Sequence, residues 1–396
     1  MTSRTERLYF LDNIRSFITI WVVVLHGAII YMEYGVDWYP VVDQQRSLFF
    51  SILIMLVEPT LMTAMFFIAA YFALPSIAAR GSRAFLKSKL LRIGVPWVLG
   101  VVLVTPPVDY LILLAAKSPT GWFEFCTSEY WRLHYHQGPY WFLGVLLVFF
   151  LVFSLVWQGS HWLRTPPERI SIPSRKQLAA FWALMTLGMF AVQLLWVPKT
   201  PFHIFGNVVA VMPSRIHLYS GYFIMGLVAW RNRWFSSAGY NPRLIPWVAV
   251  LVVSMALYSA SRALSTDARS LEVLARVLHL NEGSTALHAT ARMSVLIKLM
   301  NVSLFNAMSL SALLASCALF KRHFNSTGPI QRSLAANSFG IYFIHAAVLY
   351  PIGYLFLDVQ MPLMVKFTIV TSLGFFLSWA ASALILRKAP FLRQVF

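Results

Sequence analysis

The segment LYFLDNIRSFITIWVVVLHGAIIY, residues 8 to 31, is an apolar run of membrane-spanning length that nevertheless contains Asp12, Arg15 and His26. An arginine near the centre of a membrane helix costs about 2.5–3.5 kcal/mol on insertion scales, so it usually faces a protein interior or a water-filled cavity. Arg15 and His26 are separated by about three helical turns and share one face, about 16 Å apart. Asp12 falls on the same face and is positioned to pair with Arg15. This helix is therefore predicted to carry a polar face inside a membrane bundle.

The composition of the whole chain agrees with a membrane protein. Of its 396 residues, 59% are hydrophobic and 12% are charged, whereas soluble domains contain about 25% charged residues. Apolar runs of about 20 residues predict roughly ten transmembrane helices, near residues 8–31, 47–74, 93–116, 140–158, 178–197, 215–230, 244–260, 293–320, 338–357 and 363–386. The predicted fold is an all-α, polytopic membrane helix bundle that forms a single domain over residues 1–396.

The distribution of basic residues predicts the orientation of this bundle. The chain has 32 Lys and Arg against 14 Asp and Glu, a net charge of +18. Most of the basic residues fall in segments on one side of the predicted spans, which is the positive-inside pattern of cytoplasmic loops. Both termini are therefore predicted to be cytoplasmic. The lipid bilayer, and not nucleic acid, explains the charge, and nothing in the sequence predicts an oligomeric state.

Several motifs of other protein classes do not occur in the sequence. The two cysteines, Cys126 and Cys317, are predicted on opposite sides of the membrane and lack the spacing of a metal site. There is no Walker loop and no Gly-rich dinucleotide turn. No metal and no tightly bound cofactor are therefore expected.

A basic segment lies between the second and third predicted spans and includes Arg83, Lys87, Lys89 and Arg92. One interpretation is anchoring on the cytoplasmic side by the positive-inside rule. The other is that Lys89 and Arg92, three residues apart on one helical face, bind the phosphates of a cytoplasmic donor through charge-assisted hydrogen bonds.

The predicted outer loops 117–139 and 261–292 are long and polar. The first contains His134 and His136, which would diverge on a helix because they are two residues apart, and which are predicted to be surface histidines and not metal ligands. The aromatic residues of this loop are typical of an interfacial belt, although aromatic rings also stack on sugars.

Further charged residues lie inside predicted spans, among them Glu58, Lys298 and Lys366. Glu58 precedes Pro59 in the second span, and because a carboxylate in a membrane must be paired or protonated, it is a candidate for substrate binding or the partner of a neighbouring polar group. Lys298 and Lys366 are predicted to extend their side chains toward the membrane interface.

Four blocks of the sequence resemble the acyltransferase-3 family of membrane acyltransferases. The first is the arginine and histidine with ten residues between them, Arg15 and His26, in the first helix. The others are FFIAAYF at 66–72 with KLLRIGVP at 89–96, GPYWFL at 138–143, and NSFGIYFIH at 337–345. The sequences of the first two blocks are most similar to those of the glucan biosynthesis protein C branch of the family, which succinylates periplasmic glucans.

The resemblance implies an O-acyltransferase of the bacterial cytoplasmic (inner) membrane. It would move an acetyl or succinyl group from cytoplasmic acyl-CoA, its donor substrate, to a hydroxyl of an extracytoplasmic carbohydrate such as a glucan. His26 is the expected base, because imidazole is suited to accept a hydroxyl proton near neutral pH. Arg15, deeper toward the inner side, is expected to bind a phosphate or the carbonyl oxygen of the donor or to orient the pocket, with Asp12 holding its guanidinium. The donor is expected to be bound also by Lys89, Arg92, Arg83 and Lys87.

The acceptor side of this site is expected to include Trp141 and Tyr342 from the family blocks, together with His345 and Glu58. For His345, a role in packing through a hydrogen bond is an equally good interpretation. The sequence is compatible both with direct general-base transfer and with an acyl-histidine intermediate. The alternative function is a transporter of an organic anion or an acyl-bearing small molecule, for which repeated halves with interrupted helices are typical; no convincing internal repeat occurs.

Overall fold

The computed structural model describes residues 7–34, 39–165, 170–195, 202–206, 208–266, 286–390 and 392–396. Helices account for 78% of the structure, which confirms the predicted all-α bundle. The longer helices are α1 (Tyr9–Ile29), α2 (Leu48–Lys89), α4 (Thr105–Ala115), α6 (Trp141–Gly159), α8 (Arg175–Leu195), α9 (Ile216–Arg231), α10 (Leu244–Thr266), α12 (Ala286–His323), α13 (Pro329–Leu355) and α14 (Leu363–Ala381). Within the described residues, the strands are β1 (His203–Phe205) and β2 (Val209–Val211), which pair in antiparallel register.

Eight helices among the described residues are long and apolar enough to cross a membrane. One of them, Leu48–Ala115, has 68 residues and reverses direction, so it contains both the second and the third predicted spans. The sixth predicted span corresponds to α9, which has only 16 residues. The predicted apolar segments are therefore helical, and the helices that are long enough fit a multi-pass membrane protein.

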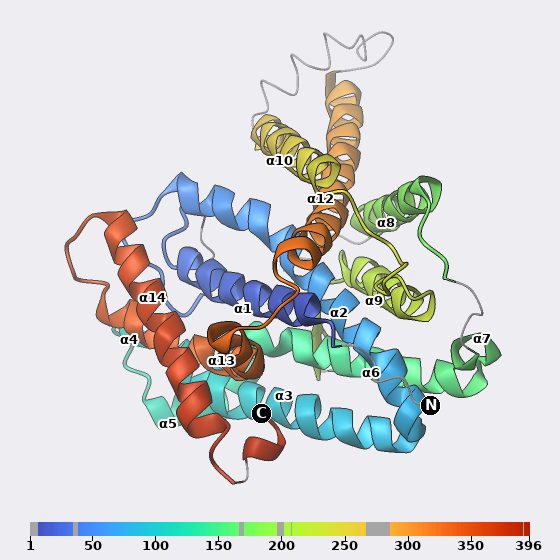
Figure 1. Ribbon diagram of the computed structural model, residues 1–396. Helices are drawn as coiled ribbons and strands as arrows, with labels where there is room; N and C mark the ends of the chain where they lie inside the picture. Colours follow the sequence, from blue (N-terminus) through green and yellow to red (C-terminus); the bar gives the residue numbers. More distant parts are fainter. Residues whose placement is uncertain are drawn as a thin grey trace.

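The reversal within Leu48–Ala115 occurs at Gly81, whose backbone has φ 77° and ψ 164°. Glycine adopts this conformation because it has no Cβ to clash with the backbone. Figure 1 shows the chain turning back sharply at the end of α2. The predicted boundaries implied that the basic segment after Gly81 is a loop. In the structure it is instead the start of the next span.

The third span is irregular. Leu90–Gly94 and Gly100–Val104 are π-helical turns on either side of α3 (Val95–Leu99), and α4 follows. An extra residue in a helical turn shifts the register of the side chains that follow, and such turns are frequent at functional sites. In this span they set the direction of α4 and therefore the position of Asp109, which α4 carries.

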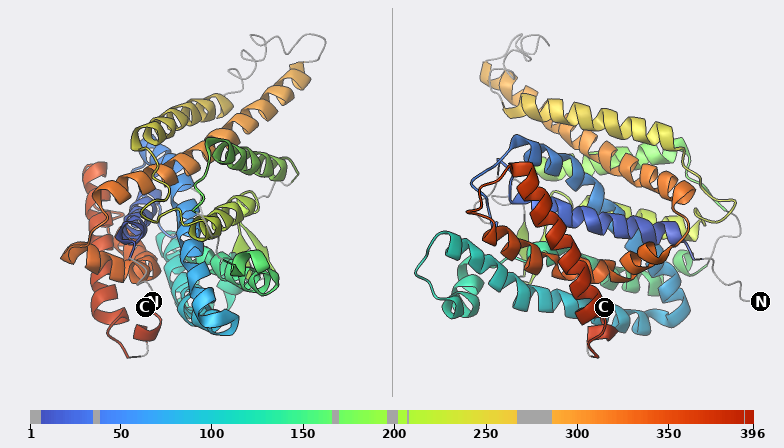
Figure 2. Two further views of the ribbon diagram at one scale, coloured as in Figure 1. Left: turned by 45° about the vertical axis from the view of Figure 1, so that its right-hand side comes forward. Right: turned by 60° about the vertical axis from the view of Figure 1, so that its left-hand side comes forward.

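The helix α1 lies in the middle of the bundle and contacts α2, α12, α13 and α14. Figure 1 and both views of Figure 2 show α1 surrounded by these helices, with α10 and the adjoining part of α12 side by side at one edge. Several apolar side chains of α1, including Phe10, Leu11 and Val23, are fully buried. Among its polar residues, Asn13, Ser16 and Thr19 are buried as well, so they face protein and not lipid.

Short elements cover one end of the bundle. The chain after α4 forms α5 (Trp122–Glu124), a π-helical segment Phe125–His134 and a short 3-10 helix Gly138–Tyr140 before α6 begins. The β1–β2 hairpin packs against α6. The predicted outer loop 261–292 lies largely outside the described residues, whereas the loop 117–139 is described throughout and forms one wall of the site.

Candidate active site

A cavity of about 890 Å³ opens among α1, α2, α4, α13 and the segment before α6. Ligand pockets for small molecules generally have volumes of about 300–1,000 Å³. The polar or aromatic residues on its wall include His26, Tyr39, Glu58, Asp109, Tyr135, His136, Gln137, Trp141, Tyr342 and Tyr350. Many of these residues come from segments predicted to face outward, so the cavity lies toward the predicted outer side of the membrane.

His26 lies on the wall of this cavity and is half-buried. Its Nδ1 is 2.8 Å from the carbonyl oxygen of Val22 on the preceding turn of α1. A carbonyl oxygen only accepts hydrogen bonds, so Nδ1 carries the proton and Nε2 keeps its lone pair. The contact therefore fixes the tautomer in which Nε2 can act as a base or a nucleophile.

The position of His26 is secured by the close approach of α14. Gly27 is next to it in α1, and a Cβ built on Gly27 would lie 2.3 Å from the Oγ1 atom of Thr371. Only glycine leaves room for the two helices to pack this closely. The ring of His26 is thus presented to the cavity from a tightly packed segment.

His345 on α13 is the neighbour of His26 from the predicted site. The two ring centroids are 4.8 Å apart and the rings are edge to face, with an interplanar angle of 67°. The Nδ1 atom of His345 donates to the carbonyl oxygen of Tyr342 at 2.6 Å, and its buried Nε2 has no hydrogen-bond partner among the described residues. His345 is fully buried and lies behind His26, outside the lining of the cavity.

Arg15 lies apart from this cavity. Its guanidinium is 3.5 Å from Asp12, as predicted, and donates to the carbonyl oxygen of Ala335 at 3.2 Å. Asp12 also pairs with Arg7 at 3.0 Å. The side chain of Arg15 is 37% exposed, and it is absent from the described lining of the cavity. Arg15 and His26 thus share a helix face, about 16 Å apart, but they do not share a cavity.

Glu58, Trp141 and Tyr342, which the sequence assigned to the acceptor side, lie on the cavity wall. Glu58 forms an ion pair with Arg215 at the start of α9, and the Arg215 guanidinium lies 4.8 Å from the centroid of the Phe305 ring. The Tyr342 hydroxyl donates to the carbonyl oxygen of Pro139, which ties α13 to the segment before α6. The ring of Trp141 packs against those of Phe202 and Tyr219.

The four residues predicted to bind the donor divide into two groups. Lys89 lies within electrostatic range of Arg92 and Arg80, and its ammonium is 4.4 Å from the centroid of the Phe150 ring. Arg83 and Lys87 instead line a separate, mainly apolar groove. The basic segment therefore presents one cluster of cations, Arg80, Lys89 and Arg92, away from the cavity of His26.

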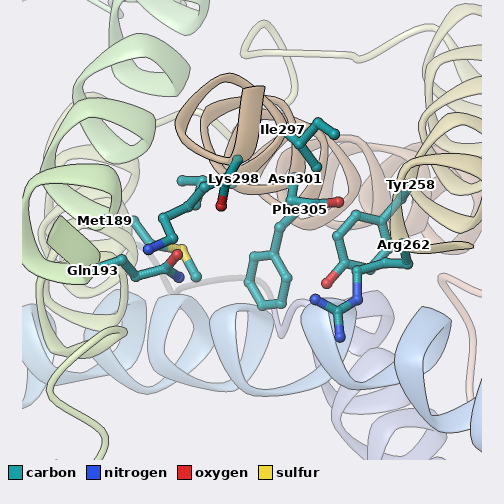
Figure 3. Close-up of a pocket in the computed structure, with 10 residues that line it drawn as sticks. Met189, Gln193, Tyr258, Arg262, Ile297, Lys298, Asn301 and Phe305 are labelled. Carbon is teal, nitrogen blue, oxygen red and sulfur yellow. The ribbon is translucent and has the colours of Figure 1, made fainter. Parts of the chain in front are cut away.

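A second pocket, of about 290 Å³, lies between α8, α10 and α12 (Figure 3). Lys298, predicted to extend toward the interface, lines it near Gln193, with Tyr258 and Arg262 on the opposite side. Phe305 lines this pocket as well and also supports Arg215, the partner of Glu58. The ion pair of Glu58 thus lies between the two pockets.

The prediction for Lys366 is wrong. Its side chain is 1% exposed, and its ammonium is 2.6 Å from the carboxylate of Asp43 and 3.1 Å from the carbonyl oxygen of Leu357. A buried lysine is retained where it is paired and hydrogen-bonded. Lys366 therefore joins α14 to the segment between α1 and α2.

The structure also brings together two residues that sequence reasoning did not combine. His136 was predicted to lie at the surface, but its Nε2 is 2.7 Å from the carboxylate of Asp109, whose side chain is 2% exposed. The side chain of His136 is 27% exposed, so the surface prediction holds only in part for it, while the side chain of His134 is 48% exposed and pairs with Glu129 at 3.5 Å. Asp109 is a carboxylate inside a predicted span, so the rule that selected Glu58 also applies to it.

Together, the bundle and its cavity define a polytopic membrane protein with a tautomerically fixed imidazole at an internal site. A family model described as an acyltransferase domain, Acyl_transf_3, matches residues 8–385, so the chain belongs to this family of membrane acyltransferases. Neither the curated proteins nor the solved structures gave a match. The predicted family and the predicted class of enzyme, an acyltransferase in a membrane, are confirmed, while the resemblance to the glucan branch stays a prediction.

Proposed function

We propose that this protein transfers an acyl group, acetyl or succinyl, from cytoplasmic acyl-CoA to a hydroxyl of an extracytoplasmic carbohydrate, at His26 and in the bacterial inner membrane. The observation that carries the proposal is the placement of His26 on the wall of a cavity of about 890 Å³, with Nδ1 held by Val22 at 2.8 Å. The basic Nε2 of His26 therefore borders a cavity that is large enough for an acyl group and part of a sugar.

The proposed reaction is direct transfer. The Nε2 atom of His26 takes the proton of the acceptor hydroxyl as the oxygen attacks the thioester carbonyl. The tetrahedral intermediate then collapses, the carbon–sulfur bond breaks, and the imidazolium returns the proton to the departing thiolate of coenzyme A. The hydrogen bond from Nδ1 to Val22 stabilises the imidazolium, because the carbonyl dipole points its oxygen at the positive ring.

The donor's phosphates are assigned to the opposite end of α1. Arg15 is partly exposed and is about three turns from His26, so it cannot touch the thioester carbonyl at the same time as His26 acts on it. The long, narrow pantetheine arm of coenzyme A can bridge such a separation. We therefore assign Arg15 to the phosphate-bearing part of the donor, with the cluster of Arg80, Lys89 and Arg92 as a second contact for phosphate oxygens.

The proposal is tested with purified full-length protein, radiolabelled acetyl-CoA or succinyl-CoA, and glucose oligosaccharides. His26→Ala is expected to lower kcat by about 10²–10⁴-fold, the usual range for loss of a general base. Arg15→Ala is expected to raise the KM for acyl-CoA with a smaller effect on kcat, and Arg15→Lys should recover part of the affinity. Full turnover by His26→Ala would remove this residue from the mechanism.

The donor contact is tested in the same assay. Lys89→Ala combined with Arg92→Ala should raise the KM for acyl-CoA. Arg175→Ala combined with Lys176→Ala is the matched control, because both residues are exposed at the start of α8 and also lie on the predicted cytoplasmic side. Equal KM values for the two double variants would leave Lys89 and Arg92 as topology signals.

Two further outcomes separate the alternatives. Label that stays covalently attached to wild-type protein, but not to His26→Ala, when no acceptor is present would replace direct transfer by an acyl-histidine intermediate. Uptake of labelled donor or acyl group into vesicles without any transfer to a hydroxyl would favour the transporter. Mass shifts in cell-surface glycans with and without the protein identify the acyl group.

A further inference from the structure

The pair formed by His136 and Asp109 is a second polar site on the wall of the same cavity, and the proposed function above does not use it. Asp109 projects from α4 and His136 from the segment that precedes α6. Their side chains are 2.7 Å apart at the closest atoms, and that of Asp109 is 2% exposed. A carboxylate in this position needs a physical reason, because desolvation of an ion is costly.

His136 is held in one orientation by contacts on three sides. Its Nδ1 accepts a hydrogen bond from the backbone N–H of Gly138 at 2.9 Å. The proton of the neutral ring is therefore on Nε2, which faces Asp109. The Tyr130 hydroxyl donates to the backbone carbonyl of His136. With both ring nitrogens engaged, His136 positions Asp109 and does not itself offer a free nitrogen to a ligand.

The carboxylate of Asp109 keeps unused capacity for hydrogen bonds. Its Oδ1 is buried and has no hydrogen-bond partner among the described residues, whereas its Oδ2 faces His136. Buried polar atoms in native proteins are nearly always paired, so an unpaired carboxylate oxygen at a cavity wall calls for an absent partner. Because the carboxylate faces the Nε2–H of His136 through Oδ2, its unpaired Oδ1 is available as an acceptor, and the ligand group that fits it is a hydrogen-bond donor.

The position of the pair relative to His26 indicates which substrate it serves. Tyr350 lines the same wall and interacts with both, since its ring centroid is 6.4 Å from that of His26 and it interacts electrostatically with Asp109. Tyr135 and Trp141 line the same cavity. A ligand with several hydroxyl groups and apolar C–H faces fits this wall, because the hydroxyls can donate to the carboxylate and the C–H faces can pack on the aromatic rings. The phosphates of an acyl donor would instead be repelled by the carboxylate.

We infer that Asp109, positioned by His136, is the acceptor-binding residue of this enzyme and accepts hydrogen bonds from hydroxyl groups of a carbohydrate whose reactive hydroxyl is presented to His26. The inference rests on the proposed function for the identity of the reactive hydroxyl. Binding of the carbohydrate by Asp109 is measurable without any turnover.

The test is equilibrium binding of unsubstituted glucose tetrasaccharides, without acyl-CoA, to the full-length detergent-purified protein by isothermal titration calorimetry. Hydrogen bonds to a charged group contribute about 1.5–3 kcal/mol, so Asp109→Asn should weaken binding by about 10–100-fold. His136→Gln should weaken binding less, because it removes only the positioning contact. Glu129→Gln is the matched control, since Glu129 also pairs with a histidine of this segment but is outside the described cavity lining, and its affinity should stay within about twofold of wild type.

Wild-type affinity in Asp109→Asn, or no binding of any tetrasaccharide by the wild type, would overturn the inference. Should Asp109→Asn fail to fold, Asp109→Glu is measured instead, and it too is expected to bind more weakly because the carboxylate is displaced. Failure of the proposed function looks different: saccharide binding would depend on Asp109, yet no acyl group would be transferred. In steady-state assays, Asp109→Asn should raise the KM for the acceptor and leave the KM for acyl-CoA unchanged.

Discussion

The imidazole rings of His26 and His345 lie edge to face, with their centroids 4.8 Å apart, although the two residues are on different helices at opposite ends of the chain. Only His26 lines the cavity. His345 is fully buried behind it, with Nδ1 donating to Tyr342 and Nε2 unpaired among the described residues. This places His345 where it can act on the reaction through His26, whose charge changes when it takes a proton.

The first prediction concerns His345. Its Nε2 is an acceptor beside a ring that becomes positive during transfer, so His345→Phe should lower kcat by about 10-fold, equivalent to 1.4 kcal/mol of lost stabilisation, and should leave both KM values unchanged. His345→Asn, which keeps an acceptor, should recover part of kcat. Unchanged kcat in His345→Phe would assign this residue to packing alone. Steady-state kinetics with the donor and the acceptor varied separately provide the measurement.

The packing of Gly27 against Thr371 gives the second prediction. A Cβ at Gly27 would lie 2.3 Å from Thr371 Oγ1, so Gly27→Ala should destabilise the protein by about 1–3 kcal/mol through overpacking and should lower activity by displacing His26. Thr371→Ala removes the clashing atom, and its hydroxyl has no hydrogen-bond partner among the described residues. The double variant should therefore recover both stability and activity. Additive losses in the thermal unfolding of the double variant would contradict this account.

The buried pair of Lys366 and Asp43 gives the third prediction. Removal of one partner from a buried ion pair generally costs about 3–5 kcal/mol, because the other charge is left uncompensated. Lys366→Met and Asp43→Asn should each lower the unfolding temperature, while the double variant should be more stable than either single variant. Each charge keeps one further hydrogen bond, Asp43 from the backbone N–H of Gln45 at 2.8 Å and Lys366 to the carbonyl oxygen of Leu357 at 3.1 Å, so the two single variants should lose similar stability. A double variant less stable than both would exclude a pairwise role.

The fourth prediction tests the orientation in the membrane through Cys126, which lies in the segment predicted to be outside. Partial burial raises the pKa of the Cys126 thiol, and the nearby carboxylate of Asp109 raises it further. Only the thiolate reacts with maleimides, so labelling by a membrane-impermeant maleimide added outside the cell should be slow at neutral pH and accelerate as the pH rises. Asp109→Asn should make labelling faster at a given pH.

Cys317 serves as the internal reference for that experiment, because it is buried among α12 and its neighbours and should stay unlabelled in folded protein. Labelling of Cys126 only when the probe has access to the cytoplasm would reverse the predicted topology. Fast labelling already at neutral pH would contradict the raised pKa.

Many features of this protein could be predicted from local sequence patterns. Apolar runs of membrane length predicted the helices, because each span must satisfy its own backbone hydrogen bonds within the bilayer. The placement of Arg15, Asp12 and His26 on one face follows from helical periodicity alone, and the ion pair of Arg15 with Asp12 is observed. The family blocks predicted an acyltransferase, which the match over residues 8–385 confirms.

The arrangement of the site was decided by contacts between helices that are far apart in the sequence. The periodicity of one helix does not determine which side chains of a neighbouring helix lie opposite it. The packing of α13 on α1 placed His345 behind His26, and the course of the chain around α4 joined Asp109 to His136. The same packing put Glu58 beside Arg215 and enclosed Lys366 with Asp43. It also left Arg15 off the cavity wall, because two residues three turns apart on one helix face can border different spaces.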